Sequence, residues 1–500
     1  MTGNADLPRD HRLYRAEQVG ELDRRAIEDH GIGGYELMQR AGRAVFAALQ
    51  TRWPEARRVL VCCGGGNNGG DGYVIARLAL EAGLDVQVCA QSDAERLDGE
   101  ARHAAEAWRE AGGGIVDDAG SIEPDGADVI VDALLGTGLD RPVRDDYAEL
   151  IERINAAGAP IVAVDVPSGV QADTGAVLGT AVRAALTVSF IGRKRGLETG
   201  SAPDHVGCLL FDDLEVPAAV HEGMAADARR LDAGLVGRLL PPRVPTTHKG
   251  ALGHVLVVGG DHGMPGACLL AAHAALTAGS GLVSVATRAG HAVSLAAGLP
   301  EAMWTDGEDG DALDALLGRA DVVALGPGLG RSEWSAAVWL CALRSDRPLV
   351  VDADALNLLA ERSAESGVQR GDWVLTPHPG EAARLLDGSV EDVQSDRFEA
   401  VRAIAKRFDA VVVLKGAGSL IADPGGRTAL CPFGTPAMAT AGMGDALTGI
   451  VSSLVGQGLA PFEAACAGVV LHARAGERAA GHRRSILAGE LIAALPDVLP

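Results

Sequence analysis

Short, continuously apolar runs alternate with longer amphipathic stretches along most of the chain. A short apolar run bounded by glycine or polar residues predicts a buried strand, and apolar residues every three or four positions predict a helix. Two helices, at 16–30 and 35–53, are expected to open the chain. The first half then continues with strands predicted at 58–63, 85–90, 128–134, 160–166, 184–191 and 206–211, and with helices between them at 70–82, 94–111 and 147–157.

The alternation resumes in the second half of the chain. There we expect a helix at 267–278, closing helices that begin near 445, 461 and 487, and strands at 254–258, 282–286, 322–325, 348–351, 373–376, 411–414 and 419–422. Continuously apolar strands that alternate with helices are typical of a parallel sheet covered on both faces, so both halves are predicted to be α/β.

Residues 215–247 interrupt this alternation. They show no strand pattern, include one short helical piece near 228–240, and contain the prolines Pro217, Pro241, Pro242 and Pro245. Such a segment is typical of a linker between domains. A chain of 500 residues also exceeds the size of one ordinary hydrophobic core. We therefore predict two domains, at 1–222 and 223–500.

Composition narrows the possible partners. The net charge is −23 and aromatic residues make up 3% of the chain, which argues against nucleic acids and anionic membranes. Residues 1–15 lack the apolar core of a signal peptide, no apolar run is long enough to span a membrane, and the eight cysteines form no CxxC pair. We expect a cytoplasmic protein that binds small molecules.

Lysine is rare in this acidic chain. The four lysines are Lys194, Lys249, Lys406 and Lys415, and all but Lys406 lie in glycine-containing motifs. Because a protein of negative net charge needs local cations to bind phosphate groups, these three lysines are candidate anion ligands.

A glycine-rich segment, 64–72, follows the strand predicted at 58–63, and its glycines have the GxGxxG spacing of a dinucleotide-binding loop. Asn67, Asn68 and Asp71 add polar side chains that a plain pyrophosphate loop does not need. The second strand ends at Ala90 without the acid that would hold a ribose. A ligand site of another kind and a polar turn that only packs the helix on the strand both remain open.

Two further predicted strands end in polar motifs. Asp132 precedes the turn at 136–138, and Asp165 precedes a turn that holds Ser168. The carboxyl ends of parallel strands meet at one edge of a sheet, where α/β proteins bind ligands. Asn68, Asp132 and Ser168 would offer oxygen ligands suited to a hard cation, and Asp165 would remain a free carboxylate, available as a base. Each aspartate could instead cap its own turn.

These segments resemble the NAD(P)H-hydrate epimerase domain over about residues 12–215, and Lys194 resembles that family's lysine–glycine element, although Arg193 stands where a smaller residue is expected. The resemblance implies a Rossmann-like three-layer sandwich and a reaction that inverts C6 of a hydrated dihydronicotinamide ring, with Asp165 as the candidate base. It implies a potassium ion held by Asn68, Asp132 and Ser168. It also implies substrate contacts from Asn67, Asn68, Gly69, Gly70, Asp71, Gly136, Thr137, Gly138, Leu139, Asp140, Arg141, Pro142 and Lys194.

The second half carries a denser set of motifs at the ends of predicted strands. They lie at 248–250, 263–267, 325–330, 352–357, 376–381, 414–419 and 439–446. Each of them could be an ordinary turn or helix cap, but their occurrence together favours a ligand site.

The stretch 439–446 is the most informative of these motifs. Glycines at a loop-to-helix junction let backbone N–H groups converge, and the helix dipole favours an anion there. We therefore expect an anion hole at Gly442, Met443 and Gly444. Asp445 lies inside this site, where a carboxylate would orient and deprotonate an attacking hydroxyl.

Together these motifs resemble the ADP/ATP-dependent NAD(P)H-hydrate dehydratase of the ribokinase-like superfamily, over about residues 225–500. The resemblance implies that Asp445 receives the proton of the C6 hydroxyl while that oxygen attacks the terminal phosphate of the nucleotide, with Mg²⁺ helping, and that phosphate then leaves. Asp352 and Glu381 are candidate acids that either support the residues in contact with the ligands or orient a metal. The implied nucleotide contacts are Lys415, Gly416, Ala417, Gly418, Ser419 and Gly444, and the implied substrate contacts are Ala267, Gly328, His378 and Asp445.

We therefore expect a bifunctional enzyme. It would epimerise the R and S forms of hydrated NADH and NADPH (NADHX and NADPHX) and dehydrate the S form with consumption of ADP or ATP. We also expect a homo-oligomer. The alternative is a kinase for a vitamin precursor of the hydroxymethylpyrimidine or thiazole type, fused to a dinucleotide-binding module without catalytic activity.

Overall fold

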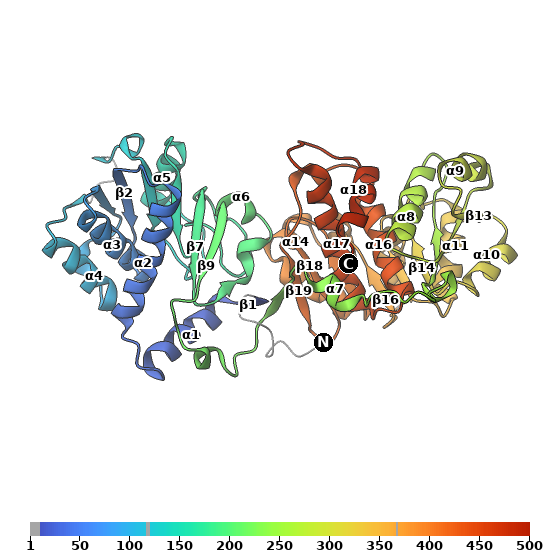
Figure 1. Cartoon of the computed structure of the whole chain (residues 1–500), viewed down its shortest axis with the longest axis horizontal. Helices are drawn as coiled ribbons and strands as arrows, with labels where there is room; N and C mark the ends of the chain where they lie inside the picture. Colours follow the sequence, from blue (N-terminus) through green and yellow to red (C-terminus); the bar gives the residue numbers. More distant parts are fainter. Residues whose placement is uncertain (1–10, 117–120, 367–368) are drawn as a thin grey trace. The chain divides into compact units, whose positions relative to one another are not determined.

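The computed structural model describes residues 11–116, 121–366 and 369–500 and is drawn in Figure 1. It consists of two compact units, which divide between Arg229 and Arg230. The predicted division at 222/223 lies shortly before this point, so the residues between the two positions pack with the first unit. None of the helices within the described ranges has the length and apolar character needed to cross a membrane.

The first unit is built on a seven-stranded sheet in which every neighbouring pair of strands is parallel. Its order is β4-β3-β2-β5-β6-β7-β9. The strands are β2 (Arg58–Cys63), β3 (Asp85–Ala90), β4 (Ile115–Val116), β5 (Val129–Ala133), β6 (Ile161–Val164), β7 (Leu186–Phe190) and β9 (Cys208–Asp212).

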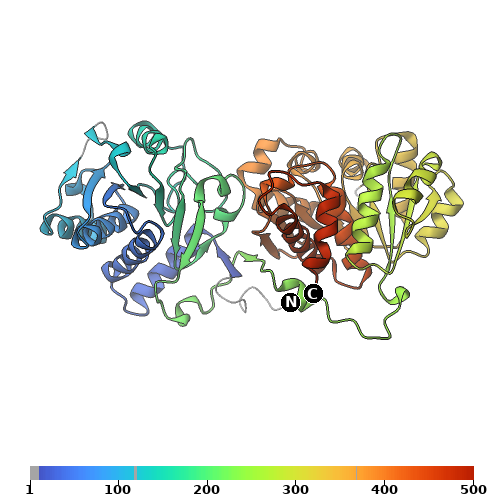
Figure 2. The ribbon, with the colours of Figure 1, turned by 45° about the horizontal axis from the view of Figure 1, so that its top comes forward.

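Successive residues of these strands face two different cores. Val59 and Val61 of β2 belong to a core shared with α1 (Ala16–Glu28), α2 (Gly34–Arg52), α3 (Asn67–Glu81) and α4 (Gly99–Glu110). Leu60 and Cys62 point the other way, into a core with α5 (Asp145–Ala156). Figure 2 shows the helices on both sides of this sheet. The predicted three-layer α/β sandwich is therefore confirmed, because strands buried on both faces must be apolar throughout.

Three short strands complete the first unit. β1 (Arg12–Tyr14) pairs in parallel with β8 (Arg193–Lys194) and antiparallel with β10 (Ala228–Arg230). The prediction that 215–247 contains no strand is therefore wrong. β10 is too short to show a pattern of its own, and it forms because β1, far away in the sequence, offers it a paired edge.

Two predicted helices differ from those observed. α3 begins at Asn67 rather than at 70, because Gly66 caps it and the Gly66 carbonyl accepts the Gly70 N–H at 3.1 Å. The helix predicted at 94–111 is split into a 3-10 turn, Ala94–Arg96, and α4, with Gly99 at a φ of 55° between them. The asparagines of the glycine-rich segment thus lie on the first turn of a helix, where N–H groups are unpaired.

The second unit has its own mostly parallel sheet, in the order β13-β12-β11-β14-β15-β16-β17, followed by antiparallel β18 and β19. The strands are β11 (His254–Val258), β12 (Leu282–Thr287), β13 (Met303–Asp306), β14 (Val322–Leu325), β15 (Leu349–Val351), β16 (Trp373–Leu375), β17 (Val411–Leu414), β18 (Ser419–Ala422) and β19 (Thr428–Cys431). The helices include α8 (Pro265–Thr277), α11 (Glu333–Arg344), α12 (Asp354–Ser366), α13 (Pro379–Leu385), α14 (Val390–Ser395), α15 (Arg397–Phe408), α16 (Met443–Gly456), α17 (Pro461–Ala480) and α18 (Ala488–Ala494).

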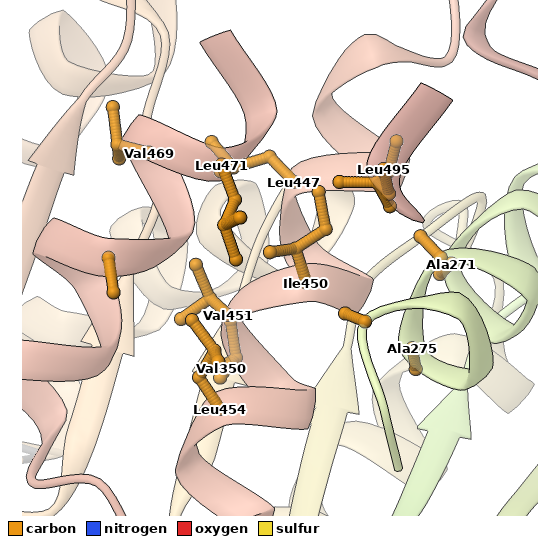
Figure 3. Close-up of a cluster of buried hydrophobic side chains, with 14 of the residues drawn as sticks. Ala271, Ala275, Val350, Leu447, Ile450, Val451, Leu454, Val469, Leu471 and Leu495 are labelled. Carbon is orange, nitrogen blue, oxygen red and sulfur yellow. The ribbon is translucent and has the colours of Figure 1, made fainter. Parts of the chain in front are cut away.

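Helix α16 is the centre of the core of the second unit. Figure 3 shows Val451 and Leu454 of α16 beside Val350 of β15, and Leu471 of α17 on the adjacent side. At Gly449 the helix crosses α8 so closely that a Cβ would lie 2.1 Å from the carbonyl oxygen of Ala271. Because α16 is surrounded by sheet and helices, its N-terminal turn is held in a fixed position.

Candidate functional site

The first unit contains a cavity of about 640 Å³ at the carboxyl ends of its parallel strands. This is the edge where an α/β sheet binds ligands. Most of the residues predicted for this site line the cavity: Asn67, Asn68, Asp71, Gly136, Thr137, Gly138, Leu139, Asp140, Arg141, Asp165 and Lys194.

Gly69, Gly70 and Pro142, also predicted as substrate contacts, do not line this cavity. The two glycines serve packing. A Cβ on Gly69 would lie 2.0 Å from the carbonyl oxygen of Gly64, and a Cβ on Gly70 would lie 2.5 Å from Cε of Met38. They let the start of α3 approach the rest of the unit closely.

Helices α1 and α2 supply a wall of the cavity that sequence reasoning missed. It comprises Val19, Asp23, Ile27, Gly34, Leu37, Met38 and Ala41. The sequence pattern of such amphipathic helices predicts only that one face packs on a core, and does not show that the face also lines a cavity. The one available signal was Asp23, an acid next to the buried stripe formed by Val19, Leu22 and Ala26 of α1.

Asp165 is not the free carboxylate that was expected. Its Oδ1 accepts hydrogen bonds from Lys194 Nζ, from Ser189 Oγ at 3.1 Å and from the Phe190 N–H at 3.1 Å. Lys194 is buried, with 2% of its surface exposed, and also donates to the Phe190 carbonyl at 3.0 Å. Asp165 has a φ of 64°, in the left-handed region that non-glycine residues rarely occupy. The cavity therefore holds an ion pair on a constrained backbone, a feature common at functional sites.

Asp132 and Ser168, two of the predicted cation ligands, are in direct contact. The Asp132 carboxylate accepts the Ser168 hydroxyl at 2.6 Å and the Ser168 N–H at 2.8 Å. Burial raises the pKa of Asp132 to about 6, although the hydrogen bonds from Ser168 oppose that rise. A bound cation would supply the positive charge that this buried carboxylate lacks.

Asn68, the third predicted ligand, lies against Gly136, where a Cβ would be 3.3 Å from Cβ of Asn68. Its Nδ2 is buried without a hydrogen-bond partner in the described ranges. Those ranges contain no cluster of three or more His, Cys, Asp or Glu side chains that could hold a metal ion. A site for a hard cation here would thus depend on amide and hydroxyl oxygens beside Asp132.

In the second unit, the N-terminus of α16 lies beside Lys415, a partly buried lysine. Gly442 caps the helix with a φ of 88°. A Cβ on Gly444 would be 3.2 Å from Lys415 Nζ and 3.4 Å from the Asp352 carboxylate, so the first turn of α16 closely approaches both side chains. The predicted anion hole and the predicted nucleotide-binding lysine are therefore brought together.

Lys415 is held by two acids. Its Nζ donates to Asp352 Oδ1 at 2.7 Å and lies 3.9 Å from Glu381 Oε2. Asp352 Oδ2 accepts the Thr448 hydroxyl at 2.8 Å. Burial opposes ionisation of Asp352, yet Lys415 and the hydrogen bonds keep the pKa of Asp352 below its ordinary value. Both oxygens of Asp352 accept hydrogen bonds, so Asp352 positions Lys415; its role in orienting a metal stays a prediction.

Asp445 has different surroundings from Asp352, although both carboxylates interact with the charge of Lys415. Burial raises the pKa of Asp445 to about 7, the negative charge of Asp352 adds to the rise, and Lys415 opposes it. A carboxylate that titrates near neutral pH at a helix N-terminus is suited to act as a general base.

The remaining predicted substrate residues lie at strand and helix ends. His378 caps α13, and its Nδ1 accepts the Gly380 N–H at 2.9 Å while the Glu381 carboxylate accepts the His378 N–H at 2.8 Å. Burial raises the pKa of Glu381 to about 7, and Lys415 opposes that rise. Gly328 has a φ of 57°, and a Cβ there would be 3.1 Å from Cβ of Ala267, so these two predicted contacts are neighbours.

The predicted nucleotide loop, 415–419, links β17 to β18, with Gly416 and Gly418 at φ values of 141° and 59°. The Ser419 hydroxyl donates to the Gly416 carbonyl at 3.0 Å. Arg397, which sequence reasoning missed, is buried and donates to the carbonyls of Leu414 and Lys415, both at 3.2 Å. The sequence around an arginine in a helix does not indicate that its side chain binds the backbone of a loop elsewhere in the chain.

Comparison with known proteins gives the same division of the chain. The family model described as NAD(P)H-hydrate dehydratase matches residues 255–497, and the one described as YjeF-related protein N-terminus matches residues 34–196. A ribokinase-like superfamily protein from Enterococcus faecalis is similar in structure, with a TM-score of 0.52 and 26% identity, over 55% of this chain and 95% of that chain.

Two relatives match nearly the full length. Both are named bifunctional NAD(P)H-hydrate repair enzyme Nnr. The one from Coxiella burnetii is 48% identical over 481 residues, which cover 96% of this chain and 97% of its own. The one from Escherichia coli is 43% identical over 491 residues, which cover 98% and 94%. With both family models and both full-length matches in agreement, this chain belongs to the family of bifunctional NAD(P)H-hydrate repair enzymes.

Proposed function

We propose that the protein repairs hydrated nicotinamide cofactors in two steps, one in each unit. The first unit interconverts the R and S epimers of NADHX and NADPHX. The second unit dehydrates the S epimer to NADH or NADPH with consumption of ADP or ATP. The observation that carries the proposal is Asp445, a base with a pKa of about 7 at the N-terminus of α16, where Gly444 adjoins Lys415.

The dehydration follows from this geometry. Asp445 takes the proton of the C6 hydroxyl as its oxygen attacks the terminal phosphorus of the nucleotide, and the bond to the departing nucleotide breaks. The N–H groups of Gly442, Met443 and Gly444 stabilise the transferring phosphoryl group. The C6–O bond then breaks, a proton leaves C5, and inorganic phosphate departs as the C5=C6 double bond of the dihydropyridine forms.

Lys415, held by Asp352, supplies fixed positive charge beside the phosphates, and the 415–419 loop binds the nucleotide. The substrate lies along Ala267, Gly328 and His378. Mg²⁺ enters with the nucleotide, since such ions are bound largely by phosphates and water and need few protein ligands.

In the first unit, Asp165 is the base of the epimerisation, and its ion pair with Lys194 holds its carboxylate in place. We infer that Asn68, Asp132 and Ser168 hold a potassium ion, which would supply positive charge beside Asp132. The inference is tested by the melting temperature of the protein in KCl against choline chloride. We expect K⁺ to raise the melting temperature of the wild type and not that of Asp132→Asn; an equal effect on both would contradict it.

The function is tested by mixing acid-hydrated NADPH with the purified protein. With ADP and Mg²⁺ present, the absorbance band of reduced nicotinamide should return; without nucleotide it should not. A phosphorylated product that accumulates without return of this band would support the vitamin-precursor kinase instead.

The proposal also covers the oligomeric state of the enzyme and its cellular compartment. We propose a cytoplasmic homo-oligomer, a placement supported by free, buried thiols such as those of Cys62, Cys63 and Cys268. Light scattering would test the assembly, since a monomeric mass would contradict it. Fractionation of the source cells would test the compartment.

A further inference from the structure

Asp23 enters the epimerase cavity from α1, outside every motif discussed above. It lines the cavity together with Asp71, Asp165 and Lys194. Within the described ranges, neither Asp23 nor Asp71 has a hydrogen-bond partner for its carboxyl group, whereas Asp165 is paired with Lys194. Two carboxyl groups therefore face the ligand space with no partner in the protein.

The environment of this cluster opposes ionisation of all three carboxyl groups at once. Three carboxyl groups share one ammonium group, and Lys194 already donates to Asp165. Burial raises the pKa of Asp71 well above its ordinary value, with Asp165 and Asp23 adding to the rise. Burial also raises the pKa of Asp23, to about 6. Asp71 thus holds its proton more strongly than an ordinary aspartate, while Asp165 is the carboxyl group that is paired with Lys194.

An epimerisation at C6 requires a base and an acid. C6 carries a hydroxyl and is bonded to the ring nitrogen N1, so it can open to an aldehyde. When the base removes the hydroxyl proton, C6=O forms and the C6–N1 bond breaks, and its electron pair on N1 takes up a proton. Rotation about C5–C6 and the reverse steps close the ring with the hydroxyl on the other face. No atom or electron is gained or lost.

We propose that Asp71 is the acid that gives N1 its proton, opposite in role to Asp165, and that Asp23 is the positioning residue whose negative charge keeps Asp71 protonated. This inference rests on the proposed epimerase function of the first unit. It explains why α1 places an acid among the apolar residues that line this wall of the cavity.

The test starts from purified R-NADPHX and follows its conversion to the S epimer by chromatography, without nucleotide, in the full-length protein. We expect Asp71→Asn to lower kcat/KM by at least about 100-fold, the range of general acid catalysis. Asp71→Glu, which keeps the acid, should retain far more activity. Calorimetry verifies that the first unit of each variant is folded, because dehydration of S-NADPHX takes place in the second unit and does not report on the first.

The role of Asp23 is tested by a separate measurement, the pH dependence of kcat/KM. The kcat/KM of the wild type should fall at high pH as Asp71 loses its proton, and Asp23→Asn should shift this fall to lower pH because it removes a neighbouring negative charge. The other titratable or charged groups that line the cavity are Glu100, Asp140, Arg141, Tyr147, Asp165 and Lys194, and they are unchanged in this variant. Glu21→Gln is the matched control, since Glu21 lies two residues away on α1 and pairs with Arg24 and Arg25.

The outcomes distinguish the epimerase function of the first unit from the roles of Asp71 and Asp23 in it. If the wild type does not interconvert the epimers, the proposed function of the first unit fails. If the wild type does and Asp71→Asn is equally fast, the assignment of the acid fails while the function stands. If Asp23→Asn leaves the pH profile where it was, the positioning role of Asp23 fails.

Discussion

Two aspartates of the second unit, Asp352 and Asp445, show how neighbours decide what a carboxylate can do. Asp352 accepts hydrogen bonds from Lys415 and Thr448, which stabilise its charge. Asp445 lies near the same lysine but is not paired with it, so burial has the largest influence on the pKa of Asp445. The first is therefore a permanent anion that positions Lys415, and the second is poised between its two protonation states.

This difference predicts the pH dependence of dehydration. A base works in its ionised form, so kcat/KM should rise about tenfold per pH unit up to about pH 7 and then level off. Asp445→Asn should remove this rise and lower kcat by about 10³-fold or more, near the upper part of the range for general base catalysis.

The measurement is the initial rate of NADPH formation from S-NADPHX between pH 5.5 and 9, in about half-unit steps. Calorimetry is the control for folding, because a folded variant keeps the unfolding transition of the second unit. A variant at the wild-type rate would remove Asp445 from the chemistry.

At the scale of the element, α16 matters because packing fixes where its N-terminus points. The helix crosses α8 at Gly449, where no side chain fits, and is covered by α17 and the sheet. An anion site made of backbone N–H groups depends on this rigidity, because the groups cannot be re-aimed one by one.

Gly449→Ala should therefore destabilise the second unit by about 1–3 kcal/mol, because the new Cβ would lie 2.1 Å from the Ala271 carbonyl oxygen and the helices must separate. Gly489→Ala is the matched control on α18, where a Cβ meets nothing within 4 Å; there we expect a gain of about 0.4–1 kcal/mol.

Calorimetry would measure both substitutions, using the transition that ADP with Mg²⁺ moves upward to identify the second unit. Equal melting temperatures for the two variants would show that the close crossing of α8 and α16 is unimportant.

For the whole molecule, each unit contains all the residues assigned to its own site. This arrangement fits a substrate that exists as two epimers when only one can be dehydrated. Variants in one unit should then leave the chemistry of the other intact.

Asp165→Asn should stop recovery of NADPH from an epimer mixture once the S form is used, leaving the R form, while the initial rate on pure S-NADPHX stays within about twofold of the wild type. Asp445→Asn should give the opposite result, namely continued interconversion of epimers and no NADPH. The two are measured by chromatography of R and S forms over time. Loss of both activities in either variant would argue against independent sites.

Much of the architecture was predictable from local pattern. The strands Arg58–Cys63 and His254–Val258 have the predicted bounds, because residues buried on both faces of a parallel sheet are apolar in unbroken runs. Motifs at the ends of neighbouring parallel strands meet at one sheet edge for the same topological reason. The sequence therefore predicted that Asp132, at the end of β5, and Ser168, after β6, lie close together.

The sequence by itself thus determined which segments are buried and which polar residues follow the strands. Only the tertiary structure decided which distant residues meet. It paired β1 with β10, placed Lys194 against Asp165, placed Arg397 against the 415–419 loop, and brought Asp23 to the wall of the cavity. Burial of a residue depends on its own chemistry and that of its neighbours in the chain, whereas the charge that faces it is set by residues tens to hundreds of positions away.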